Sequence, residues 1–237
     1  GLEVVSSPHT MAPRVRVLSN GRYSVVVDSS GGGFSSFDKS VMLTRWREDP
    51  TTTASGSFVY IHDPKKKKTW SAAYQPTKAD PTSYESIFSP GRAEFKRFDD
   101  KVFVHTEITV APEDDVELRR ITVTNLGDSE RELDVVSYME PVLVGRRADS
   151  AHPAFSKLFV GVEALKDSDA ILCSRRPRTE SEREIFFFHR VTLRTSYAPI
   201  RFFTSRADFI GRGGSLAEPN AFSGQPNAAR PAESSID

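Results

Sequence analysis

Hydrophobic and polar residues alternate along much of this chain, with the period of two expected of strands that have one buried face. In KVFVHTEITV, residues 101–110, Val102 faces one side of such a strand, Phe103 the other, and the pattern continues to the end of the segment. The preceding AEFKRF ends at Asp99-Asp100, a pair suited to a tight reversal. Residues 92–110 are therefore predicted to form a β-hairpin.

The same alternation predicts a second hairpin and several further strands. VELRRITVTN, a turn at LGDSE and RELDVVSYMEPVL indicate two long strands within residues 116–143. In SRADFIGRG, Ser205 and Asp208 have capping-box spacing and Gly211 can close a single helical turn. The other strands are predicted at residues 23–27, 57–62, 155–165, 170–174, 185–193 and 200–204.

The fold class follows from this pattern and from the turn-forming residues. Helical periodicity over a useful length is almost absent, and 15 prolines and 14 glycines interrupt the chain at strand-length intervals. An all-β fold is predicted, a large antiparallel sandwich with a few short helical turns. Residues 1–222 are expected to form one domain. Because the composition shifts to Gly, Pro, Asn, Ala and Ser from Gly211 onward, residues 223–237 are expected to be a linker or a disordered tail.

Composition narrows the classes of partner. The chain has 32 basic and 32 acidic residues, so no global field draws it toward nucleic acid or anionic lipid. The basic run Lys65–Lys68 is expected at a solvated hairpin tip. No apolar run approaches the roughly 18 residues of a membrane span, so no direct membrane insertion is expected. A single cysteine, Cys173, excludes an internal disulfide.

Motifs for catalysis or metal binding are weak. No Gly-x-Ser-x-Gly motif occurs, and Cys173 lies in the apolar context ILCSRR, which favours a buried thiol over a reactive one. The five histidines show no His-x-His or His-x-x-x-His spacing, so no metal site and no cofactor are predicted. Acidic residues such as Glu113 and Asp99 lie at turns, where turn chemistry alone explains them. No catalytic residue is predicted.

A mixture of aromatic and planar polar side chains gives the best candidate binding chemistry. The run SSGGGFSSF lacks the spacing of a phosphate loop, and its glycines indicate a bulge or a close backbone approach. Sugars are bound by aromatic faces and by hydrogen bonds from Arg, Asp, Glu and Gln, so the mixture suits a carbohydrate, although a tryptophan in a sandwich is also typical of the core. The residues are Phe34, Phe37, Arg45, Trp46, Arg47, Trp70, Tyr74 and Gln75.

Several ordered motifs together resemble one known family. The chain is similar, from about Arg16 to about Phe222, to the amino-terminal β-sandwich of glycoside hydrolase family 94, formerly glycosyltransferase family 36. Within it the likeness is to the carboxy-terminal phosphorylase-like region of bacterial cyclic β-1,2-glucan synthases. The motifs are SNGRYSVVVDSSGGGFSSF, LTRWRED, SFVYIHD, TWSAAYQPT, PEDDVELRRITVTN, AHPAFSKLFV and RADFIGRG.

This resemblance implies a fold and a division of labour. It implies a galactose mutarotase-like super-sandwich whose last strands fall beyond Asp237, and a separate (α/α)6 barrel that carries the catalytic acid and the phosphate site. The chain is then expected to be non-catalytic and to shape the acceptor side for a β-linked glucan, with β-1,2 as the expected linkage. The parent is expected to be a bacterial enzyme at the inner membrane, with this domain on the cytoplasmic side.

The resemblance also nominates residues near the mouth of that barrel. Two alternatives remain open, an autonomous carbohydrate-binding module and a purely structural domain that mediates homodimer contacts. The residues nominated for substrate binding are Arg45, Trp46, Arg47, Glu48, Asp49, Tyr74, Gln75, Arg206 and Arg212.

Overall fold

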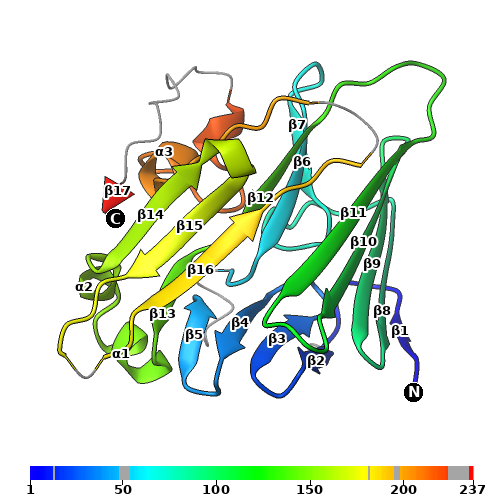
Figure 1. Cartoon of the computed structure of the whole chain (residues 1–237). Helices are drawn as coiled ribbons and strands as arrows, with labels where there is room; N and C mark the ends of the chain where they lie inside the picture. Colours follow the sequence, from blue (N-terminus) through cyan, green and yellow to red (C-terminus); the bar gives the residue numbers. More distant parts are fainter. Residues whose placement is uncertain (13, 48–53, 181, 195–197, 224–234, 237) are drawn as a thin grey trace.

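Four antiparallel sheets dominate the part of the chain that the computed structural model describes, which is residues 1–12, 14–47, 54–180, 182–194, 198–223 and 235–236 (Figure 1). The first sheet has the order β1 (Glu3–Val5), β8 (Ser83–Ser89), β9 (Arg92–Asp99), β10 (Val102–Val110), β11 (Glu117–Asn125). The second has the order β13 (Pro141–Val144), β5 (Val41–Thr44), β4 (Gly33–Phe37), β3 (Tyr23–Asp28), β2 (Val15–Ser19).

Two smaller sheets complete the architecture. The third has the order β12 (Asp134–Tyr138), β6 (Phe58–Asp63), β7 (Lys68–Ser71). The fourth has the order β16 (Ile185–Arg190), β15 (Ala170–Arg175), β14 (Val160–Leu165), β17 (Ser235–Ile236). Helical structure is confined to α1 (Arg146–Ala151), α2 (Pro153–Lys157), α3 (Arg206–Ile210), η1 (Lys166–Ser168) and η2 (Asn220–Phe222) among the described residues. The predicted all-β class with few short helical turns is confirmed.

The main core lies between the first two sheets. Tyr23 and Val25 of β3 pack in one cluster with Phe88 of β8 and Phe95 of β9, and all four side chains are buried. Cys173 of β15 belongs to the same cluster, so the fourth sheet also covers this core. The prediction that Cys173 is a buried thiol is therefore confirmed.

Strand β6 is buried on both of its faces because different elements cover them. Val59 and Ile61 pack with Trp70 in a second cluster, whereas Tyr60 packs with Phe209 in a third. Phe209 comes from α3, which packs against η2. The helix begins as predicted, since the Ser205 hydroxyl accepts a hydrogen bond from the Asp208 amide at 3.2 Å.

Close backbone approach explains the glycine run. A Cβ atom on Gly33, whose φ is +144°, would lie 1.9 Å from the carbonyl oxygen of Val26 on the neighbouring strand. A Cβ atom on Gly31 would lie 2.4 Å from the Cβ of Ala73. The glycines therefore let the β3–β4 turn approach the segment after β7, as the sequence indicated.

The second predicted hairpin is wrong in its pairing. Both strands exist, but β11 pairs with β10 in the first sheet and β12 pairs with β6 in the third. Arg131 in the connection donates to the Asp100 carbonyl at 2.5 Å and pairs with Asp63 at the end of β6, which holds the crossing in place. Alternation identifies a half-buried strand but carries no information about its partner.

Three of the other predicted strands need correction. Residues 155–165 do not form one strand, because α2 occupies their beginning and β14 starts only at Val160. Proline is favoured in the first turn of a helix, and Pro153 begins α2 just before an apolar run that resembles a strand in the sequence. The strand predicted at 185–193 ends at Arg190. Residues 200–204 have no regular secondary structure.

Two further expectations concern the chain's end and the membrane. Most of the predicted tail, residues 224–234 and 237, lies outside the described residues, while β17 pairs with β14. The single-domain boundary at residue 222 therefore stays a prediction. Among the residues described, no helix is both long and apolar enough to traverse a lipid bilayer.

Candidate functional site

Arginines and acids from four separate segments meet where β5 ends. Arg45 donates to Glu140 at 2.9 Å and to Asp149 of α1 at 3.1 Å. Arg47 donates to Asp149 at 2.7 Å, and Arg206, the first residue of α3, donates to Glu140 at 2.9 Å. The five side chains form an alternating arrangement of charges, Arg206–Glu140–Arg45–Asp149–Arg47, which is called the arginine–carboxylate ladder below.

The side chains of the arginine–carboxylate ladder are partly buried. The Arg45 and Asp149 side chains are only 10% and 4% exposed. Burial raises the pKa of Glu140, but the hydrogen bond from Arg206 and the charge of Arg45 outweigh it and hold that pKa below its ordinary value. Burial and the nearby Glu140 charge raise the pKa of Tyr138, whose hydroxyl donates to Glu140 at 2.8 Å. Glu140 is thus ionised at neutral pH, with Tyr138 neutral beside it.

A small pocket of about 210 Å³ opens beside the ladder. Arg45, Arg47 and Arg206 line it together with Lys157 and Tyr138. The Nε of Arg45 is buried and has no hydrogen-bond partner among the described residues. Three of the nominated residues therefore share one pocket.

The other nominated residues do not join this pocket. Trp46 packs against Phe34, with ring centroids 5.3 Å apart. The amides of Tyr74 and Gln75 both donate to the Ser30 carbonyl, and neither residue lines the small pocket. Arg212 is exposed and does not line it either.

Glu48 and Asp49 lie outside the described residues. The sequence also missed Glu140 and Asp149, the acids that pair with the nominated arginines. An arginine that becomes buried needs an acidic partner, but the sequence does not tell which of 32 acids provides it.

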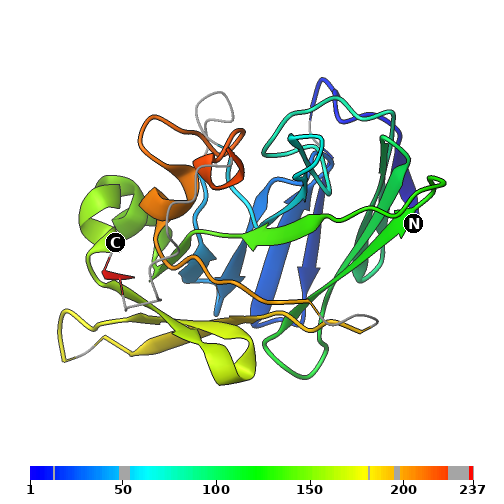
Figure 2. The ribbon, with the colours of Figure 1, turned by 90° about the horizontal axis from the view of Figure 1, so that it is seen from above.

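A second, larger cleft of about 1040 Å³ lies between the fourth sheet and the strands opposite it. In Figure 2 the fourth sheet (yellow) forms a layer of its own on one side of the other sheets. Polar groups from three strands reach this cleft, among them Glu117 and Arg119 of β11, Ser137 of β12 and His189 of β16. Phe58 and Tyr138 line both the cleft and the small pocket, so the two spaces share a wall.

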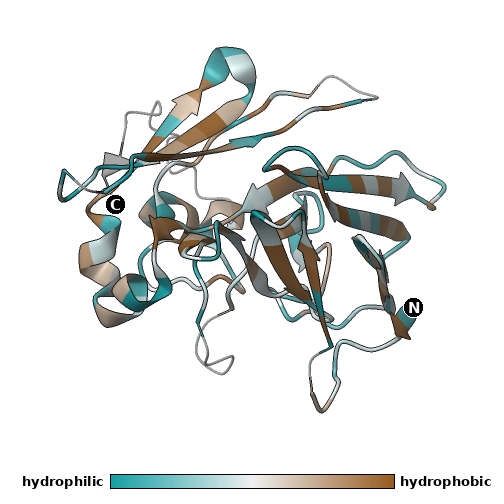
Figure 3. Ribbon diagram, turned by 60° about the horizontal axis from the view of Figure 1, so that its bottom comes forward, coloured by the Kyte–Doolittle hydropathy of each residue, from teal (hydrophilic) through white to brown (hydrophobic). Residues whose placement is uncertain are grey.

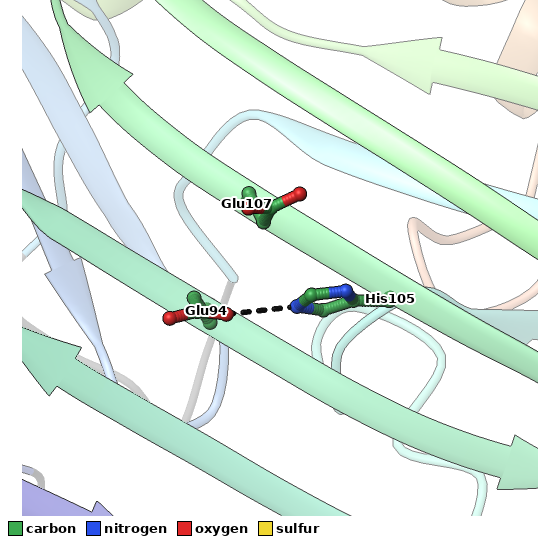
Figure 4. Close-up of side chains that lie close together, drawn as sticks. All are labelled: Glu94, His105 and Glu107. Atoms are coloured by element: carbon green, nitrogen blue, oxygen red, sulfur yellow. Dashed lines mark hydrogen bonds and ion pairs between the residues drawn. The ribbon is translucent and has the colours of Figure 1, made fainter.

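The structure also brings together a histidine and two glutamates of suitable type for a metal (Figure 4). Glu94 and Glu107 face each other on β9 and β10, and His105 lies 2.9 Å from Glu94. Arg92 contacts both glutamates, at 3.0 Å and 3.4 Å, and Arg120 contacts Glu107 at 2.5 Å. Since every carboxylate oxygen of the pair already has a cationic or imidazole partner, the cluster is an ion-pair network.

The described architecture, four antiparallel sheets around shared cores with loop-end pockets, defines a β-supersandwich domain. Residues 2–235 match the family described as "Glycosyl hydrolase 94, supersandwich domain", and the chain belongs to that family. The family resemblance seen in the sequence is confirmed.

Curated relatives agree with this assignment. The chain is 35% identical over 222 residues, 93% of its length, to the cyclic beta-(1,2)-glucan synthase NdvB of Rhizobium meliloti, of which it covers 8%. It is 27% identical over 56% of its length to the 3-O-beta-D-glucopyranosyl-beta-D-glucuronide phosphorylase of Paenibacillus borealis, covering 16% of that protein. It is 22% identical over 58% of its length to the N,N'-diacetylchitobiose phosphorylase of Vibrio proteolyticus, covering 18%. These relatives are bacterial, and the chain spans less than a fifth of each.

Proposed function

We propose that this chain is the non-catalytic supersandwich of a bacterial family 94 enzyme that acts on β-linked glucan. The family match over residues 2–235 carries the proposal. The more specific proposal, that the parent enzyme is a cyclic β-1,2-glucan synthase or a related phosphorylase, rests on the names of the relatives. Because the chain spans such a small share of those relatives, we assign catalysis to an (α/α)6 barrel elsewhere in the parent protein, at the cytoplasmic side of the inner membrane.

The arginine–carboxylate ladder is proposed to shape the acceptor side of that enzyme. Arg45, Arg47 and Arg206 converge on one small pocket although they come from segments about 160 residues apart in sequence. Planar guanidinium groups fixed by carboxylates keep some N–H groups directed outward, and these suit sugar hydroxyls. The pocket is small, so it would accept one ring edge or one side chain and not a whole oligosaccharide.

The outer face of the fourth sheet is proposed to pack against the barrel. Phe186 and Phe188 of β16 are 59% and 61% exposed, and they share that face with Leu172 of β15. Figure 3 shows strongly hydrophobic stretches on this sheet. Exposed apolar side chains gathered on one face are typical of an interface. The same face supports the structural alternative, in which the domain mediates dimer contacts.

The isolated chain provides the first test. Incubated with linear β-1,2-glucan and inorganic phosphate, it should release no glucose 1-phosphate, because the proposed catalytic acid lies on another domain. Release of glucose 1-phosphate by the pure chain would show that the sandwich itself is catalytic and would overturn the proposal.

The full-length parent provides the second test. Arg47→Gln, which alters an arginine of the small pocket whose side chain is 26% exposed, should raise the KM for the glucan acceptor several-fold while leaving kcat nearly unchanged. Arg201→Gln is the matched control, since Arg201 is exposed, pairs only loosely with Asp134 at 3.4 Å and lines neither pocket. Equal effects of the two variants on the acceptor KM would contradict a role for the pocket.

A further inference from the structure

Hydrogen-bonded polar side chains form one wall of the larger cleft. Glu117 accepts hydrogen bonds from the Ser35 hydroxyl at 2.7 Å and the Tyr23 hydroxyl at 3.3 Å, and it pairs with Arg119. Arg119 also donates from Nη1 to the Ser57 carbonyl at 2.7 Å. Both charged side chains are thereby held in fixed positions, as a preorganised binding site requires.

Charge at this wall is balanced. Burial raises the pKa of Glu117, but the positive charge of Arg119 and the Ser35 hydrogen bond hold it below the ordinary value, so the carboxylate stays ionised. The carboxylate and the guanidinium compensate each other within one pair. A ligand group that contacts this pair therefore needs no net charge of its own, and a strongly charged group would find no unmatched counter-ion in the pair.

The opposite wall adds a neutral histidine with a hydroxyl partner. Nε2 of His189 lies 2.7 Å from the hydroxyl oxygen of Ser137, which joins β16 to β12 across the cleft. Burial lowers the pKa of His189, and the charge of Arg119 lowers it further. Neutral imidazole and hydroxyl groups can each donate and accept, which matches the chemistry of sugar hydroxyl groups.

Apolar and aromatic side chains also line the cleft, alongside further charged residues such as Arg175 and Glu184. Phe37, Tyr138 and Phe187 are partly buried and line it. A volume of about 1040 Å³ is just above the roughly 300–1,000 Å³ typical of small-molecule sites. The space thus suits several linked rings that present C–H faces to aromatic side chains and hydroxyl groups to the polar wall.

We propose that this cleft is a second glucan-binding site, which takes a neutral segment of β-linked glucose between β16 and the strands β11 and β12. It is distinct from the small pocket at the arginine–carboxylate ladder, although both spaces share Phe58 and Tyr138 as a wall. The inference rests on the proposed function for its ligand class and extends it to residues that the sequence did not nominate.

Calorimetric titration of the chain with linear β-1,2-glucooligosaccharides tests the site. Binding tighter than millimolar is expected, weakened at least tenfold by His189→Gln and by Ser137→Ala. His9→Gln is the matched control, because His9 also hydrogen-bonds a polar side chain, Asp80 at 3.1 Å, but lies outside the cleft. Unchanged urea midpoints for the variants show that they remain folded.

A second readout keeps the test independent of stability. In the unaltered chain the ring protons of His189 should shift on adding glucan, while those of His9 should not. Absence of binding, or binding that Arg47→Gln abolishes and His189→Gln leaves intact, overturns the cleft site. Neither result contradicts the proposed accessory role of the domain. That role would be contradicted by release of glucose 1-phosphate from the pure chain, or by an unchanged acceptor KM of the parent enzyme in Arg47→Gln.

Discussion

Arg97 is a buried cation whose removal should destabilise the chain strongly. Its side chain is fully buried near the end of β9 and pairs with Asp99 at 2.6 Å. It also donates to the carbonyls of Ala73 and Ala79 at 2.6 Å and 2.8 Å. One guanidinium therefore anchors both the Asp99 carboxylate and the segment after β7 that carries Tyr74.

Arg97→Met leaves three acceptors without their donor. The uncompensated Asp99 carboxylate, only 3% exposed, should by itself cost about 3–5 kcal/mol of unfolding free energy. For a chain of this size that corresponds to a melting temperature lower by about 6–20 °C. The double variant Arg97→Met/Asp99→Leu should be more stable than Arg97→Met alone, because it leaves no unpaired charge.

Urea unfolding followed by tryptophan fluorescence measures these free energies, since Trp70 is fully buried in the adjoining core cluster. Lys101→Met is the control for removing a cation from the same sheet region, because the Lys101–Asp128 pair is exposed and should be worth at most about 1 kcal/mol. A loss below 1 kcal/mol for Arg97→Met, or a double variant less stable than the single one, would refute the reasoning.

Three further predictions follow from single side chains. The pKa of His189 is lowered on folding. The contribution of this histidine to stability is therefore present above its unfolded pKa near 6.5 and is lost as pH falls through its folded pKa. Between pH 7 and pH 5, the urea midpoint of His189→Gln should depend less on pH than that of the unaltered chain. Ser205→Ala removes the cap on Asp208 and should cost about 1 kcal/mol, whereas an unchanged midpoint would deny the cap any role. Burial raises the pKa of Cys173 to about 12, so Ellman's reagent should label this thiol only in denaturant, and rapid labelling of the folded chain would contradict its burial.

Some residues of the candidate site could be predicted from the sequence and others could not. LTRWRED marked Arg45 and Arg47 as unusual, and SRADFIGRG marked Arg206, but their shared pocket depends on contacts across about 160 residues of sequence. The pairing of Glu117 with Arg119 could have been anticipated, because residues two apart on one strand point to the same face. The acids Glu140 and Asp149 carried no comparable local signal.

Local pattern determined the class of this protein. Alternation with period two, the frequent glycines and prolines and the capping residues before α3 act over a few neighbouring residues, so they could be recognised directly, and the ordered motifs determined the family. Tertiary structure decided everything that depends on partners: that β11 pairs with β10 and β12 with β6, that the nominated arginines meet Glu140 and Asp149, and that β16 faces β11 across a cleft. The physical reason is that burial and pairing energies arise between segments distant in sequence, and a local pattern shows which face is buried but not what buries it.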